Sequence, residues 1–189
     1  MSELFLVRHA QASFGSSNYD QLSELGMRQS EWLGAHFASM RIHFDTLICG
    51  DMERHRQTLF GICKNMSLSA DDRVELCGLN EYNFSDLIAA FSDQFPQNSR
   101  LLESQADRSN KEKYYRLLRD ILSAWGRDEI ADVRETWQVF SDRVLGARKQ
   151  IQALARAGEK VLAVGSGRIL DHLRRRSLNL SQIKTLVLD

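Results

Sequence analysis

The chain alternates between short apolar runs and longer stretches of mixed polarity. Continuous apolar runs of this length are typical of strands buried on both faces. They occupy residues 4–7, 46–49, 74–76, 160–167 and 183–188. The longer stretches have the apolar spacing of helices, at residues 23–40, 52–66, 111–126, 135–158 and 168–178. Because strands alternate with helices, the pattern predicts an α/β fold around a mostly parallel sheet.

The pattern also predicts where several elements begin and end. Ser23 is placed to cap the first helix, and Gly126 and Gly158 are placed to end two later ones. Residues 83–105 have a mixed, polar pattern, which predicts an irregular excursion with short helices. Together with the helix that follows, this helical excursion extends over about residues 83–130. At 189 residues without a linker-like segment, we expect one domain over 1–189.

Charge and cysteine content exclude several kinds of partner. Lys plus Arg and Asp plus Glu each total 25, so the formal net charge is zero. A nucleic-acid or membrane surface would need a basic excess, and we therefore expect neither partner. The cysteines are odd in number and lack a C-x-x-C spacing, so we expect free thiols and no metal site. With no signal peptide or membrane-spanning run visible, these features predict a cytoplasmic protein.

Charged residues follow the predicted strands at the points where those strands end. Arg8 and His9 follow the first, "GDMERHRQT" follows the second, and "GSGR" ends the run that begins at residue 160. In open α/β sheets, ligands bind outside the carboxyl ends of the strands. The sequence therefore predicts that Arg8, His9, either Arg54 or Arg56, and a glycine-rich helix start meet in one site.

That set of groups suits phosphate chemistry. Guanidinium groups form planar forks that match phosphate oxygens, and a helix N-terminus also favours an anion. A neutral histidine among them can attack phosphorus, and the neighbouring cations lower its pKa and keep it neutral. The structural alternative is an ordinary strand end at Arg8 and His9 and a solvated helix turn at "ERHR". His55, between two arginines, is expected to point away from Arg54.

Other nucleotide and hydrolase motifs fail on spacing. The chain has no G-x-x-x-x-G-K-[ST], no G-x-S-x-G and no G-x-G-x-x-G. These absences argue against a Walker-type nucleotide binder, a hydrolase nucleophile elbow and a dinucleotide-binding fingerprint.

Five segments, in order from residue 4 to about residue 170, resemble motifs of the histidine phosphatase superfamily, the phosphoglycerate-mutase-like fold. "LFLVRHAQAS" is similar to the opening R-H-G signature, with Ala10 where glycine is usual, and "LSELGMRQSEWLG" to L-[ST]-x-x-G-x-x-Q-A. "CGDMERHRQTL" resembles S-x-L-x-R-A-x-Q-T, "LNEYNFSDL" resembles L-x-E, and "ETWQVFSDRV" resembles E-[ST]-x-x-x-F-x-x-R-V. The resemblance implies a three-layer α/β/α sandwich.

The resemblance also implies roles for individual residues. His9 would be the nucleophile that becomes phosphohistidine, and Arg8 and Arg54 would hold the phosphate, with Arg54 taking the second arginine position in place of Arg56. Glu81 would protonate the leaving oxygen and then activate water, and no metal or cofactor would be needed. The residues expected to line the entrance are Gln11, Ser13 and Ser23.

The chain departs from the family pattern at two places. The family ends its later strand V-S-H-G-G, whereas this chain has "VGSGR", which puts Ser166 at the position of the histidine and Arg168 at that of the last glycine. Ser166 and Gly167 would still bind phosphate, without a cationic donor. The segment after the last helix is short, so residues 183–188 are either a shortened final strand or a sign that the natural sequence has been cut or altered.

These observations favour a phosphatase that hydrolyses a small phosphomonoester through a phosphohistidine intermediate. The Ser166 departure motivates a first alternative, a weakly active or inactive relative that binds a phosphate ligand. A phosphoglycerate-mutase-type phosphotransferase is the second alternative. The expected partner is a small phosphorylated metabolite or phosphate, and the oligomeric state is not predicted.

Overall fold

The computed structural model describes residues 2–13, 20–107, 110–175 and 182–186. The chain divides into two compact units, the first formed by Met1–Glu81 and Arg143–Asp189, the second by Tyr82–Asp142. The organisation of 1–189 as one domain stays a prediction.

A parallel sheet forms the centre of the first unit. Its strands are β1 (Glu3–Arg8), β2 (Thr46–Cys49), β3 (Val74–Glu75), β4 (Lys160–Gly165) and β5 (Gln182–Leu186). They lie in the order β3-β2-β4-β1-β5, and every ladder among the described residues is parallel. The predicted α/β fold is confirmed. Residues 187 and 188 of the predicted last strand lie outside the described residues.

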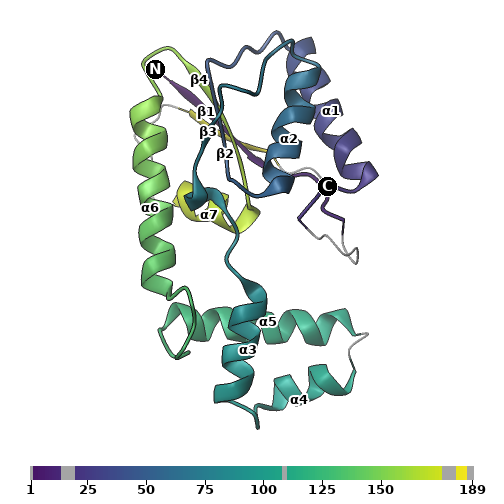
Figure 1. The fold of residues 1–189 in the computed structure, drawn as a ribbon, viewed down its shortest axis with the longest axis vertical. Helices are drawn as coiled ribbons and strands as arrows, with labels where there is room; N and C mark the ends of the chain where they lie inside the picture. The colour runs from purple at the N-terminus through teal and green to yellow at the C-terminus, as the bar shows by residue number, and fades with distance from the viewer. Residues whose placement is uncertain (1, 14–19, 108–109, 176–181, 187–189) are drawn as a thin grey trace. The chain divides into compact units, whose positions relative to one another are not determined.

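Helices cover both faces of this sheet (Figure 1). The helices α1 (Glu24–Ser39) and α2 (Glu53–Lys64) lie on one side, and α7 (Gly167–Arg175) and the later part of α6 (Trp137–Leu154) lie on the other. Side chains alternate along a strand, so each face receives its own set. The α1–α2 side includes the strand residues Phe5, Val7, Leu47, Cys49, Leu162 and Val164. The other set, all fully buried, is Leu4, Leu6, Ile48, Val161 and Ala163.

The helices α1 and α2 cross with their backbones almost in contact. A Cβ atom added to Gly34 would lie 2.1 Å from the carbonyl oxygen of Ile62, and one added to Gly61 would lie 1.9 Å from Ser30 Oγ. Small residues therefore occupy the buried stripe of α1 beside Leu33 and Phe37. Other apolar residues in the helical spacing face solvent, and Trp32 and Met40 are each 61% exposed. Periodicity alone does not reveal this, because it counts large apolar residues and not glycine.

Helix ends follow the predictions in part. Ser23 is the N-cap of α1 and its side chain accepts a hydrogen bond from Gly26 N, as predicted. The helix predicted to end at Gly158 ends at Leu154, and Gly158, with φ of 93°, lies in the turn before β4. The last predicted helix begins at Gly167, and residues 176–178 lie outside the described residues.

The second unit is helical. It contains α3 (Phe84–Gln94), α4 (Ser99–Ala106) and α5 (Lys111–Gly126), and the beginning of α6 also belongs to it. The N-caps of α3, α4 and α5 are asparagines whose side chains accept backbone N–H groups of the first turn: Asn83, Asn98 and Asn110. The predicted short helices are present, and asparagine capping defines where they start.

Candidate active site

The end of β1 is fixed from two directions. Arg8 lies opposite Gly165 in the ladder between β1 and β4, and His9 N donates to Gly165 O at 3.0 Å. Ala10 N donates to Thr58 Oγ1 at 3.1 Å, and the same hydroxyl donates to Arg54 O at 2.7 Å. Thr58 thereby ties the residue after His9 to α2, so the first predicted strand end and the second meet.

The ring of His9 has one nitrogen assigned by its surroundings. Nδ1 lies 2.8 Å from Ala10 O, and because a carbonyl oxygen only accepts, Nδ1 carries the hydrogen when the ring is neutral. The pKa of His9 is lowered to about 4, with burial as the largest cause; the Ala10 hydrogen bond opposes the shift, and the charges of Arg54 and Arg8 add to it. At neutral pH the imidazole is therefore uncharged and carries its lone pair on Nε2.

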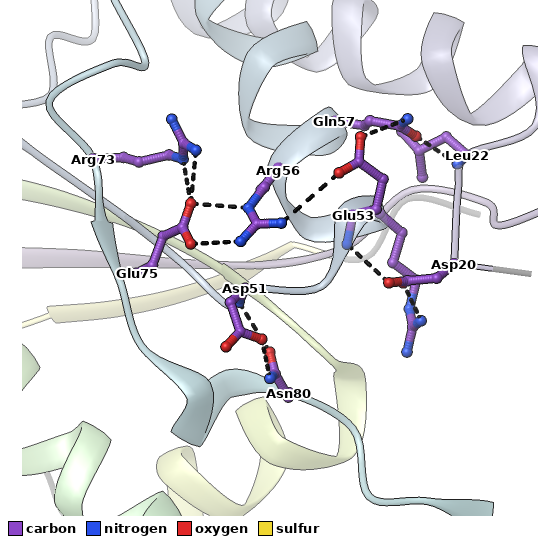
Figure 2. Close-up of polar contacts among 10 residues, drawn as sticks. Asp20, Leu22, Asp51, Glu53, Arg56, Gln57, Arg73, Glu75 and Asn80 are labelled. Carbon is purple, nitrogen blue, oxygen red and sulfur yellow. Dashed lines mark hydrogen bonds and ion pairs between the residues drawn. The ribbon is translucent and has the colours of Figure 1, made fainter.

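Of the two arginines left open by the sequence, Arg54 is the one beside His9. Arg54 is only 4% exposed, and its Nη1 contacts Asp20 Oδ1 at 2.6 Å. Arg56 instead donates from Nε and Nη2 to the Glu75 carboxylate at 2.9 and 2.7 Å (Figure 2). The charge of Arg54 is among the causes that lower the pKa of His9, whereas Arg56 is directed to Glu75.

Arg8 lies at the start of α7. A Cβ atom added to Gly167 would lie 3.1 Å from Arg8 Cδ and 3.3 Å from its Nε. The arginine side chain therefore runs directly over the first residue of this helix, where backbone N–H groups are not used within the helix. Arg8, His9, Arg54 and Gly167 are thus gathered at the carboxyl ends of β1, β2 and β4.

Ser166, the residue before α7, uses its polar groups inside the protein. It is fully buried, its N–H donates to Leu79 O at 3.1 Å, and its carbonyl accepts from Leu170 N at 3.0 Å. Its hydroxyl lies 3.1 Å from His55 Nε2. Direct phosphate binding by Ser166 stays a prediction.

His55 was missed as a site residue by the sequence. Its ring is fully buried and lies against that of His9, with ring centroids 5.4 Å apart and planes inclined by 35°. The sequence predicts His55 to point away from Arg54, but the two side chains are both buried and the charge of Arg54 acts on the His55 ring. A signal was present, because the resembled motif has alanine at this position.

Glu81 follows a segment that is fastened to the ends of two strands. Leu79 O accepts from Ser166 N after β4. After β2, the backbone N–H of Asp51 donates to Asn80 Oδ1 at 3.1 Å, and Asn80 Nδ2 donates to Asp51 Oδ1 (Figure 2). Arg143 of α6 donates to Asn80 O at 2.9 Å. Glu81 is the next residue and is partly buried, so the chain delivers it to this edge of the sheet. Its part in proton transfer stays a prediction.

The residues predicted to line the entrance hold neighbouring segments together. Ser23 Oγ donates to Gln11 Oε1 at 2.7 Å, and Gln11 N donates to Gln29 Oε1 at 3.0 Å. Ser13 Oγ donates to Gln21 O at 3.1 Å. These bonds fix the course of the chain on either side of the residues that follow His9, and contact with a substrate stays a prediction.

Within the described ranges, no group of three or more His, Cys, Asp or Glu side chains is arranged to hold a metal ion. In the same part of the chain, none of the helices has the length and apolar character needed to cross a membrane.

Comparisons with known proteins place this geometry in a family. The sequence profile of the histidine phosphatase superfamily (branch 1) matches residues 4–186. A comparison with curated protein sequences gave no match. Among solved structures, phosphoglycerate mutase from Bacillus anthracis str. Sterne is similar with a TM-score of 0.60 and 21% identity, over 90% of this chain and 77% of that one.

Two further solved structures were determined with phosphate-like oxyanions. The protein histidine phosphatase SixA, complexed with tungstate, has a TM-score of 0.53 and 12% identity, over 96% of this chain and 82% of its own. A mycobacterial glucosyl-3-phosphoglycerate phosphatase, complexed with VO3, has a TM-score of 0.53 and 19% identity, over 89% of this chain and 78% of its own. These likenesses show a shared fold, and since the profile extends over nearly the whole sequence, the protein belongs to the histidine phosphatase superfamily, branch 1.

Proposed function

We propose that this protein is a phosphatase that hydrolyses a small phosphomonoester through a phosphohistidine intermediate on His9. The observation that carries the proposal is the state of the His9 ring. Its Nδ1–H is engaged by Ala10 O and its pKa is about 4, so Nε2 has a lone pair at neutral pH. Two guanidinium groups, those of Arg8 and Arg54, act on the same ring.

The first step is transfer of the phosphoryl group. His9 Nε2 attacks phosphorus, the N–P bond forms, and the ester P–O bond breaks. Glu81 gives its proton to the departing alcohol oxygen. The second step reverses these roles, because the Glu81 carboxylate takes a proton from water as that water attacks phosphorus. The N–P bond breaks, inorganic phosphate leaves, and His9 and Glu81 return to their starting states.

Charge around His9 supports binding of the phosphate. Arg8 and Arg54 offer planar forks to its oxygens, and the N–H of Gly167 belongs to the first turn of α7, where an anion is favoured. The structures of SixA with tungstate and of the mycobacterial phosphatase with VO3 support an oxyanion ligand. We propose a small phosphorylated metabolite, in the cytoplasm, as the partner, and neither nucleic acid nor membrane.

Ser166 favours a second candidate function. A histidine at this position would offer a cationic donor to the transferring group, and a hydrogen bond to a charged group contributes roughly 1.5–3 kcal/mol. Without it, the protein would bind a phosphate ligand with little turnover. A mutase-type phosphotransferase is a further variant of the chemistry, in which the phosphohistidine passes its group to an alcohol in place of water.

The deciding experiment compares the wild type with His9→Gln and with His36→Gln, an exposed histidine on α1, as the matched control. Each is incubated with p-nitrophenyl phosphate and then with a panel of phosphorylated metabolites. We expect phosphate release and acid-labile, base-stable protein phosphate in the wild type and the control, and neither in His9→Gln. Activity is expected to persist in a chelator. Equal turnover in all three proteins would eliminate the phosphohistidine mechanism. Protein phosphate without release of inorganic phosphate would favour the phosphotransferase, and a wild type that shows neither would favour the binding relative.

A further inference from the structure

The buried pair formed by His55 and Ser166 is the strongest feature that the proposed reaction leaves unused. Both residues have no exposed surface, and a hydrogen bond of 3.1 Å joins Nε2 of the ring to the hydroxyl. The pair connects α2 to the junction between β4 and α7. The His55 ring lies beside the His9 ring, with ring centroids 5.4 Å apart. A buried polar group is costly without a partner, so the bond is needed to keep His55 in place.

The site has room for His55 because Gly50 lacks a side chain. A Cβ atom on Gly50 would lie only 2.2 Å from His55 Nδ1 and 2.5 Å from Asn80 Oδ1. Three residues differ from the motifs that the sequence resembles. The motifs have serine where this chain has Gly50, alanine where it has His55, and histidine where it has Ser166. In this chain the imidazole at this place belongs to α2, and the residue before α7 is a serine.

The hydrogen bond has a preferred direction. Within the described residues, the buried Nδ1 of His55 has no hydrogen-bond partner. A buried N–H without an acceptor is rarer in proteins than an acceptor without a donor, so the hydrogen of the neutral ring belongs on Nε2. Nε2–H then donates to Ser166 Oγ. Burial, together with the nearby His9 and Arg54, lowers the pKa of His55 well below its ordinary value, which keeps this ring uncharged.

Burial decides how the pair can act. A side chain with no exposed surface does not reach an incoming substrate, but the His55 ring contacts the ring that does. Between the Ala10 hydrogen bond on Nδ1 and the wall formed by His55, the His9 imidazole is restricted in its rotation. Correct orientation of a nucleophile is worth one to two orders of magnitude in rate even for small displacements.

We propose that His55 is a positioning residue for His9: held by Ser166, its ring forms the buried wall that keeps Nε2 of His9 directed at phosphorus. The inference rests on the proposed phosphohistidine reaction. In this proposal the His55–Ser166 pair orients His9, whereas the two arginines and the start of α7 bind the anion.

The test uses His55→Leu, which keeps bulk and removes the hydrogen bond, Ser166→Ala, and the double variant. His55→Gln serves as the conservative variant, because its amide N–H can donate to Ser166 Oγ. Three quantities are measured: the single-turnover rate of His9 phosphorylation by p-nitrophenyl phosphate, the tungstate dissociation constant by calorimetry, and the tautomer of His9 by ¹⁵N NMR. Thermal unfolding shows whether each variant is folded.

We expect His55→Leu and Ser166→Ala to slow phosphorylation by on the order of ten- to a hundredfold, with the tungstate dissociation constant within about twofold of wild type. The double variant should be no slower than the slower single variant, because the two side chains act as a unit. His55→Gln should recover most of the rate. In His55→Leu the tautomers of His9 should be mixed, because a ring that can rotate no longer keeps Nδ1–H on Ala10 O.

Three results would overturn the inference: an unchanged rate in His55→Leu, equal rates in the Leu and Gln variants, or tungstate affinity falling in parallel with the rate. The last would mean that the pair touches the anion itself. A wild type that forms no phosphohistidine would refute the proposed function, whereas the tautomer of His9 in the same variants would still support or refute positioning by His55.

Discussion

The two faces of α2 carry similar residues and do different things. Arg54, His55 and Thr58 face inward and are buried, whereas Arg56 lies on the solvent side and pairs with Glu75. The two arginines are separated by a single residue in the same helix, yet only Arg54 acts on His9. Burial and neighbours, and not residue type, therefore separate a site residue from a surface one.

The charges on the two faces are also controlled by different forces. At the inward face, desolvation is the largest cause of the lowered pKa values of His55 and of His9, the histidine after β1 that lies against it. On the outward face, the hydrogen bonds of Arg56 are the largest cause that lowers the pKa of Glu75, to about 2. Burial therefore keeps the imidazoles at the inward face neutral, whereas ion pairing keeps a carboxylate charged at the outward face.

The largest expected effect comes from exchanging the arginines for glutamine one at a time. Arg54→Gln should lower kcat/KM for p-nitrophenyl phosphate by on the order of a hundredfold or more, because charge-assisted bonds to the phosphate are lost. Arg56→Gln, the matched control, should change it by less than about threefold, since an exposed ion pair contributes little. Similar losses in both variants would remove the distinction between the two faces.

A smaller effect is expected at Thr58, which connects α2 to the residue after His9. Thr58→Val keeps the shape and leaves Ala10 N–H buried without its acceptor, so the free energy of unfolding should fall by about 1–3 kcal/mol. Thr58→Ser keeps the hydroxyl and loses one methyl group, for a loss of about 1 kcal/mol or less. Urea unfolding measures both, and a Val variant as stable as the Ser variant would contradict the described contact.

The smallest effect is expected from the ion pair on the outward face. The pKa of Glu75 is about 2 when folded against an ordinary 4.5, so its contribution is present above pH 4.5 and disappears as the pH falls towards 2. Glu75→Gln should lower the free energy of unfolding by no more than about 1 kcal/mol at neutral pH, because the pair is partly exposed. The difference from wild type should vanish near pH 2 and shrink in concentrated salt. If the difference in free energy of unfolding between wild type and Glu75→Gln grew as the pH fell, the pH dependence would have the opposite sign and would exclude the ion pair.

Much of the fold could be predicted because burial leaves a direct record in the sequence. The second strand, at residues 46–49, was predicted with its observed bounds, and the helix over residues 111–126 likewise. Ser23 was identified as a cap because its hydroxyl precedes an apolar-periodic stretch. The N-terminal starts of α3 and α4 were not located, since their capping asparagines stand in a polar region that also reads as loop.

The candidate site could be predicted only as a set of strand ends. That Arg8 and His9 would meet α2 followed from parallel topology, but the choice between Arg54 and Arg56 needed the family resemblance. His55 was missed because its importance depends on two distant residues, Gly50 and Ser166, that matter only when brought together. A motif that is considered by itself does not show that three distant residues depend on one another.

The bare backbone at Gly50 has an evolutionary consequence. While an imidazole occupies position 55, any side chain at 50 would collide with it, so the two positions cannot drift independently. A lineage changing by one substitution at a time towards the more usual motif would have to shrink residue 55 before residue 50 could grow. The order of historical steps is thus constrained by sterics, and reconstructed ancestors that carry a serine at 50 alongside a histidine at 55 should fold poorly.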